Sequence, residues 1–190
     1  MNATVVETIA SPSIAIHAIV GIEAYVAPGR RTDRSTGGSS GNEHSFHLTL
    51  LARTGEGVRN LMRLSSKSFL EGFYYKPRID LDLLAKHNEG LIVLSGCMSG
   101  LVAAPLLKND IATSKKNAQV FEQIFGDRFY IEVMRHGMPE EEIINKGLIQ
   151  VARELNIPIV ATNDSHYLDK RDAPAHDVLL CIGTGKTVAD

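Results

Sequence analysis

Five short apolar runs recur along the chain, and segments with helical periodicity separate them. Strands that alternate with amphipathic helices are typical of an α/β fold, in which right-handed crossovers connect a mainly parallel sheet. In such folds the functional side chains gather at the C-terminal ends of the strands. The expected strands span residues 19–26, 46–52, 91–95, 129–134 and 157–162.

Four helices are expected between these strands, over residues 55–69, 80–87, 113–126 and 138–156. Asp80 stands where an N-cap is expected, and Thr113 is expected to cap the third helix. Pro139 falls near the first position of the fourth helix, where proline is favoured. The helical spacing of that segment predicts a buried stripe made of Ile144, Leu148, Val151, Ala152 and Leu155.

Composition restricts the classes of protein that fit this sequence. The 190 residues suffice for one domain with a sizeable core, and the formal net charge of −2 gives no overall basic field. Contact with nucleic acid would have to be local. No apolar run reaches the length of a membrane span, so no membrane partner is expected. The two cysteines, Cys97 and Cys181, form no CxxC pair, which favours a cytoplasmic, reducing setting.

Residues able to bind a metal lie in or after several of these strands. Asp164 and His166 follow the last strand, and side chains at i and i+2 of an extended segment point the same way. Cys97 follows the third strand, and Glu23 lies late in the first. His47 lies early in its strand, which fits only if that strand is antiparallel or begins sooner. This mixture of oxygen, nitrogen and sulfur ligands suits Zn²⁺, Mn²⁺ or Fe²⁺ and a hydrolytic site.

Each of these residues also has an ordinary structural interpretation. Asp164 favours turns, and Cys97 can be a small buried apolar residue. Glu132 alternates with apolar neighbours, as a solvent-facing strand residue does. The sequence GTGKT at 183–187 resembles the end of a P-loop, but Leu180 stands where that motif needs glycine, so no P-loop is expected. The remaining histidines are expected to be structural or exposed: His17, His44, His87, His136 and His176.

Several longer stretches are together similar to one known family. They are GIEAYVAPGRR, HLTLLARTGEGVRNLMRLSSKSFLEGFYYKPRID, GLIVLSGCMSG, FYIEVMRHGMPEEE and IPIVATNDSHYLDKRDAPAHDVLLCIGTGKT. In order and spacing they resemble the PHP (polymerase and histidinol phosphatase) domain of bacterial DNA polymerase III alpha subunits, from about residue 16 onwards. The resemblance implies a distorted (β/α)7 barrel with a metal cluster at its C-terminal strand ends. It implies metal-ligand roles for Glu23, His47, Cys97, Asp164 and His166, and none for Glu132, which stays a separate candidate.

The front of the chain departs from the family. An H-x-H strand and an Asp-His pair in a TDHG-like turn have no counterpart here, and residues 1–15 form a divergent segment. We therefore expect a partial (β/α)7 barrel over residues 16–190 that lacks about two β/α units and ends before any polymerase palm domain. Its exposed apolar edge should lie near residues 19–26. A divalent metal (Zn, Mn or Mg) would then occupy an incomplete site.

Two functions follow from the resemblance. The first is structural, as a fragment of the PHP domain of a replicative DNA polymerase III alpha subunit, without polymerase activity of its own. Its partners would be the remainder of that subunit, the replisome and DNA. The alternative is a metal-dependent 3′–5′ exonuclease or phosphoesterase acting on DNA ends. The structural function is favoured because an incomplete metal cluster could not hold a scissile phosphate from both sides. A separate phosphoesterase of small monoesters is less favoured, because FYYKPRID and AHDVLLCIGTGKT resemble the polymerase branch.

Overall fold

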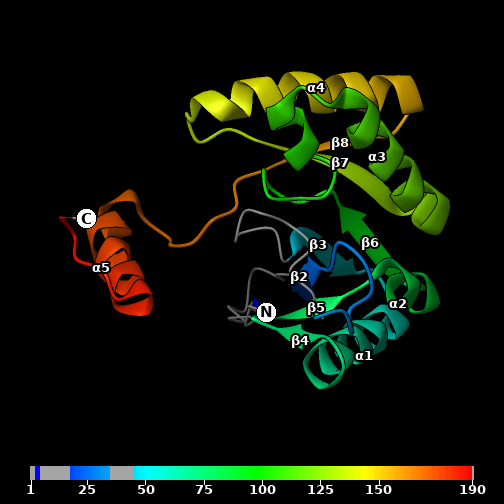
Figure 1. Cartoon of the computed structure of the whole chain (residues 1–190), viewed down its shortest axis with the longest axis horizontal. Coiled ribbons are helices and arrows are strands. Elements are labelled where there is room, and N and C mark those ends of the chain that lie inside the picture. Colours follow the sequence, from blue (N-terminus) through cyan, green and yellow to red (C-terminus); the bar gives the residue numbers. More distant parts are fainter. Residues whose placement is uncertain (1–2, 5–17, 35–44, 190) are drawn as a thin grey trace, which may run out of the picture.

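A mixed sheet runs through the protein (Figure 1). Its strands lie in the order β4-β5-β2-β3-β6-β7-β8, and β1 pairs with β2. The chain therefore forms a mixed α/β fold. The strands are β1 (Ala3–Thr4), β2 (Gly21–Val26), β3 (Phe46–Ala52), β4 (Phe73–Tyr74), β5 (Lys76–Ile79), β6 (Leu91–Leu94), β7 (Phe129–Met134) and β8 (Ile159–Thr162).

The structure is a computed structural model that describes residues 3–4, 18–34 and 45–189. Most of the expected divergent segment 1–15 and the glycine- and serine-rich stretch 35–41 lie outside the described residues, as do His17 and His44. Within the described residues, no helix is long and apolar enough to cross a membrane.

Strand β3 runs opposite to both of its neighbours. It is antiparallel to β2 and to β6, whereas β2–β5, β6–β7 and β7–β8 are parallel pairs. The expectation of a mainly parallel sheet is therefore wrong. A parallel pair needs a long crossover, usually through a helix, and among the described residues no helix lies between β2 and β3. The expected free edge at residues 19–26 is also wrong, because β2 pairs with strands on both sides.

The helices are α1 (Gly55–Leu70), α2 (Leu81–Lys86), α3 (Ile111–Phe125), α4 (Pro139–Leu155) and α5 (Ala173–Thr184), with short 3-10 turns η1 (Ala104–Lys108), η2 (Gly126–Arg128) and η3 (Lys170–Asp172). Asp80 caps α2 as predicted, since its Oδ1 accepts a hydrogen bond of 2.9 Å from the Leu83 N–H. The predicted Thr113 cap is wrong. Asp110 caps α3 instead and accepts from the Thr113 N–H at 2.9 Å, so this helix begins earlier than expected.

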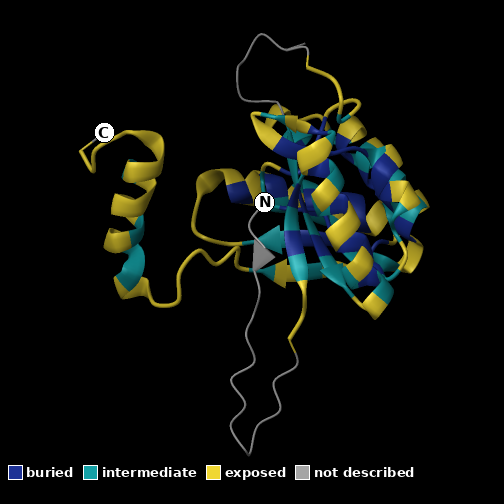
Figure 2. Cartoon of the chain, turned by 90° about the horizontal axis from the view of Figure 1, so that it is seen from below, coloured by how far each residue is buried: buried dark blue, intermediate teal, exposed yellow. Residues whose placement is uncertain are grey.

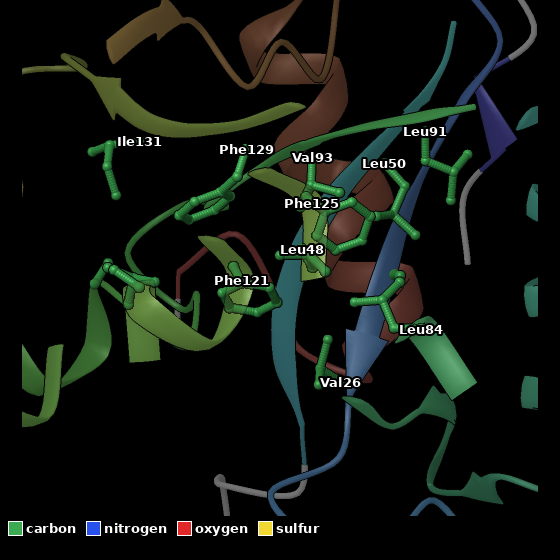
Figure 3. Close-up of a cluster of buried hydrophobic side chains, with 14 of the residues drawn as sticks. Val26, Leu48, Leu50, Leu84, Leu91, Val93, Phe121, Phe125, Phe129 and Ile131 are labelled. Atoms are coloured by element: carbon green, nitrogen blue, oxygen red, sulfur yellow. The ribbon is translucent and has the colours of Figure 1, made fainter. Parts of the chain in front are cut away.

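The hydrophobic core occupies one face of the sheet (Figure 3). In this close-up Leu48 and Leu50 of β3 lie near Phe125 of α3. Alternate residues of the strands and residues of helices α1 to α4 make up the core. Phe121 of α3 is fully buried and stacks on Phe129 of β7, with ring centroids 5.3 Å apart. In α4 the predicted stripe is buried except for Leu155, which is partly buried. Burying each large apolar side chain stabilises the fold by about 1.5–3 kcal/mol.

The opposite face of the sheet is covered less. Along β2, residues Ile22, Ala24 and Val26 are buried, and the residues between them are only partly buried. Helix α5 does not cover this face, because it lies apart from the body of the protein in both views (Figure 1 and Figure 2) and has no buried residue. The less covered face of the sheet is called the open face below.

Candidate functional site

The open face carries Glu23 and His47. In the β2–β3 register Glu23 pairs with Thr49 and Tyr25 pairs with His47, so all four side chains share one face. Because β3 is antiparallel, the start of β3 lies beside the end of β2. His47 was expected to join the other candidate ligands only if its strand is antiparallel or begins sooner. The strand is antiparallel, so His47 lies near the C-terminal end of β2.

Glu23, His47 and Cys97 meet around a single ring nitrogen. The Nδ1 atom of His47 lies 2.9 Å from Oε1 of Glu23 and 3.4 Å from Sγ of Cys97. Cys97 reaches this position through a sharp turn after β6, where Gly96 has a φ of +85°. A Cβ atom at Gly96 would lie 2.5 Å from the His47 carbonyl oxygen, so the turn packs directly on the backbone of β3.

These contacts change the pKa values of His47 and Glu23. The hydrogen bond to Cys97, followed by the one to Glu23, raises the pKa of His47 to about 9. The hydrogen bond from His47 in turn lowers the pKa of Glu23. The ring of Tyr25 contacts His47 edge-on at 5.2 Å, and the Lys76 ammonium lies 4.2 Å from the centre of the Tyr25 ring.

Asp164 and His166 lie across a cleft from Glu23. The cleft has a volume of about 670 Å³, and its wall also includes Thr49, Glu132 and Thr162. Asp164 has a φ of +46°, an uncommon conformation for a residue with a side chain and one that occurs at functional sites. The His166 Nδ1 lies 2.7 Å from the Asp164 carbonyl oxygen. This contact joins the two residues directly after β8.

Glu132 does not face solvent, so its solvent-facing interpretation is wrong. It is only 4% exposed, and its Oε2 accepts hydrogen bonds from the Gly96 N–H at 3.0 Å and the Thr49 hydroxyl at 3.3 Å. Its Oε1 accepts from the Thr162 hydroxyl at 2.7 Å. Burial raises the pKa of Glu132. Sequence reasoning missed the two threonines, although Thr49 lies two residues from His47 in the same strand and therefore on the same face.

His136 is exposed and structural, as expected, and it holds the loop that carries Asp164. Its Nδ1 lies 2.6 Å from Glu141 Oε1, and its Nε2 lies 2.5 Å from the Asn163 carbonyl oxygen. Glu141 also accepts from backbone N–H groups of the β7–α4 loop. Beside these residues is a smaller cavity of about 220 Å³, whose apolar wall is formed by Met98, Met134, Met138, Ile144 and Leu148.

The predicted ligands suit a divalent metal in their chemistry. A carboxylate and a thiol each contact the imidazole of His47, and all three groups are common ligands of Zn²⁺. However, among residues 18–34 and 45–189 no group of three or more His, Cys, Asp and Glu side chains is arranged closely enough to hold an ion. The donor set therefore fits a metal, and the described arrangement does not complete a site for one.

Comparison with known sequences places this chain in a family. A sequence model of the PHP domain matches residues 4–136, a range that includes Glu23, His47, Cys97 and Glu132. The chain belongs to the PHP domain family. The matched range ends before Asp164 and His166.

The relatives of this PHP chain are much longer proteins. It is 43% identical over 175 residues to the DNA polymerase III subunit alpha of Borreliella burgdorferi, covering 92% of the chain and 15% of that protein. It is 47% identical to the same subunit of Treponema pallidum, over 92% of the chain and 15% of that protein. For Thermus aquaticus the identity is 45%, over 94% of the chain and 14% of the relative.

Proposed function

We propose that this chain is a fragment of the PHP domain of a cytoplasmic DNA polymerase III alpha subunit. Its role is structural, and it has no polymerase activity of its own. The observation that carries the proposal is 43–47% identity to alpha subunits over more than nine-tenths of the chain. Its partners would be the remainder of the subunit and the replisome, with DNA nearby. We further propose that the open sheet represents part of a (β/α)7 barrel.

Exposed apolar surface supports a packing role. On α5, Leu179 is 63% exposed and Ile182 is 75% exposed, and neither contributes to the core of the described residues. Contiguous apolar residues on a surface mark contacts with other protein more often than they mark free surface. A helix of this kind is expected where a domain packs against further protein.

We also propose that the site binds a divalent metal (Zn, Mn or Mg) weakly. Glu23, His47 and Cys97 would hold it, and Asp164 and His166 would contribute from the far side of the cleft. When bound, such an ion lowers the pKa of a water ligand and neutralises charge on a phosphate. The Glu23 carboxylate contacts the Nδ1 atom of His47 at 2.9 Å and so fixes the orientation of the ring.

A second candidate function is metal-dependent 3′–5′ exonuclease or phosphoesterase activity on DNA ends. The observation in its favour is the cleft itself, where the carboxylates of Glu23 and Asp164 and the imidazole of His166 line a space of about 670 Å³. The observation against it is that the described donors do not form a closed cluster. A hydrolytic metal site needs about three protein ligands and an open position for water.

Degradation of 3′-labelled single-stranded DNA with Mn²⁺, Zn²⁺ or Mg²⁺ separates the two functions. We expect little or no cleavage, and no primer extension in a parallel polymerase assay. The control variants are His166→Ala, at the site, and His87→Ala, at the end of α2. Metal-dependent cleavage that disappears in the first variant and persists in the second would replace the structural function by the enzymatic one.

A further inference from the structure

Glu132 of β7 lies on the open face and contacts β3, the end of β6 and the end of β8. Its Oε2 accepts from Thr49 on β3 and from the Gly96 N–H after β6, and its Oε1 accepts from Thr162 on β8. The Glu132 N–H donates to the Ser95 hydroxyl at 2.9 Å, which adds a second link to the end of β6. One side chain of β7 therefore joins the sheet from β3 to β8.

Each of these contacts lies next to a predicted metal ligand in the sequence. Thr49 is two residues after His47 on β3, so both side chains lie on the same face. Gly96 immediately precedes Cys97, and Thr162 comes two residues before Asp164. A displacement of the Glu132 carboxylate would therefore act on the three strand ends that carry ligands.

Glu132 itself is poorly placed to bind a metal. Both of its oxygens accept hydrogen bonds, and the residue is only 4% exposed. A bound cation would have to compete with the Thr49, Gly96 and Thr162 donors for the same oxygens. The contacts thus favour a role that acts through neighbouring residues.

We propose that Glu132 is a positioning residue, whose carboxylate sets the spacing of His47, Cys97 and Asp164 without binding the metal. This inference rests on the proposed metal site. It differs from a purely structural role because it predicts a loss of metal affinity in a variant that is still folded. It differs from a ligand role because it predicts that the Glu132→Gln variant keeps its metal affinity.

Glutamine distinguishes the positioning role from the ligand role. In Glu132→Gln the amide oxygen can accept from the Gly96 N–H, and the amide nitrogen can donate to the Thr162 hydroxyl, which both donates and accepts. The link between the strands is kept, and the negative charge is lost. In Glu132→Ala the link itself is lost. Glu142→Gln, on the exposed side of α4, is the matched control for the change of charge.

The first measurement is the affinity of the whole chain for Co²⁺, followed by absorption at a temperature at which circular dichroism shows each variant to be folded. Loss of a group that orients metal ligands costs about 10–100-fold in metal affinity, and we expect a loss of that order in Glu132→Ala. Glu132→Gln and Glu142→Gln should bind as the unchanged chain does. Equal, large losses in the Gln and Ala variants would show that the charge is needed and would overturn the inference, as would unchanged affinity in Glu132→Ala.

The second measurement does not depend on metal and uses backbone amide NMR of the metal-free chain. Glu132→Ala should shift the amides of residues 47–49, 96–97 and 162–164 and speed hydrogen exchange at Gly96, whereas Glu132→Gln should change mainly β7. If Glu132→Ala fails to fold, Thr49→Val and Thr162→Val each remove one of the contacts and should shift the amides of the strand that loses it. Changes confined to β7 would overturn the inference. Absence of Co²⁺ binding by the unchanged chain, with these shifts present, would count against the proposed metal site alone.

Discussion

Substitution of Gly96 by alanine should destabilise the protein through a single close contact. The backbone φ at Gly96 is +85°, and the added Cβ would lie 2.5 Å from the carbonyl oxygen of His47. The left-handed backbone costs a residue with a side chain about 1–2 kcal/mol. Overpacking against backbone that cannot move freely adds about 1–3 kcal/mol. Together the free energy of unfolding should fall by about 2–5 kcal/mol, a large part of the ~5–15 kcal/mol typical of a domain.

Gly137 provides the matched control for this experiment. Its φ is +91°, and nothing lies within 4 Å of the Cβ that alanine would add. Gly137→Ala therefore loses only the ~1–2 kcal/mol of the left-handed backbone. Urea unfolding followed by circular dichroism gives both values, and we expect Gly96→Ala to lose about 1–3 kcal/mol more than Gly137→Ala. Equal losses in the two variants would refute the idea that the turn before Cys97 packs tightly on β3.

Two further predictions concern pH and the core. Hydrogen bonds to the Asn163 carbonyl and the Glu141 carboxylate raise the pKa of His136, so the stability it contributes should be complete below about pH 6.5 and be lost as pH rises through the folded pKa. The difference in urea stability between the unchanged chain and His136→Gln should therefore shrink from pH 6 to pH 9, and a difference that grows would contradict this. Phe121→Ala should cost about 3–5 kcal/mol, because the ring is fully buried against Phe129, and a loss below about 1 kcal/mol would contradict the packing.

The long periodic elements of this fold could be predicted from the sequence, and the short ones could not. Strands β3 and β7 have the predicted bounds, because their apolar and polar residues alternate with a period of two over several residues. The β4–β5 pair was missed, since it is short and contains Pro77, a residue that argues against a strand. Helix α5 was also missed; it contributes no buried residue, although apolar residues such as Leu179 and Ile182 recur along it.

The candidate site was predictable as a set of residue types and only partly as an arrangement. Resemblance to a family pointed to His47 and Cys97, and the structure places them in contact at 3.4 Å. The direction of β3 was not predictable, because the residues of a strand read the same in parallel and antiparallel pairs. The environment of Glu132 was also missed, since alternation alone assigns a charged strand residue to solvent. Its three donors come from elsewhere in the chain and become visible only in the folded protein.

The alternation of buried and cleft-facing residues along β3 limits where this fold tolerates insertions and deletions. Leu48 and Leu50 are fully buried in the core, while His47 and Thr49 face the cleft side. A one-residue insertion or deletion inside β3 would exchange the two sets, placing an imidazole in the core and leucine in the cleft. Both neighbours of β3 would then have to slip in register as well. Variation in length among related chains is therefore expected outside residues 46–52, even where the identities of residues within that strand change.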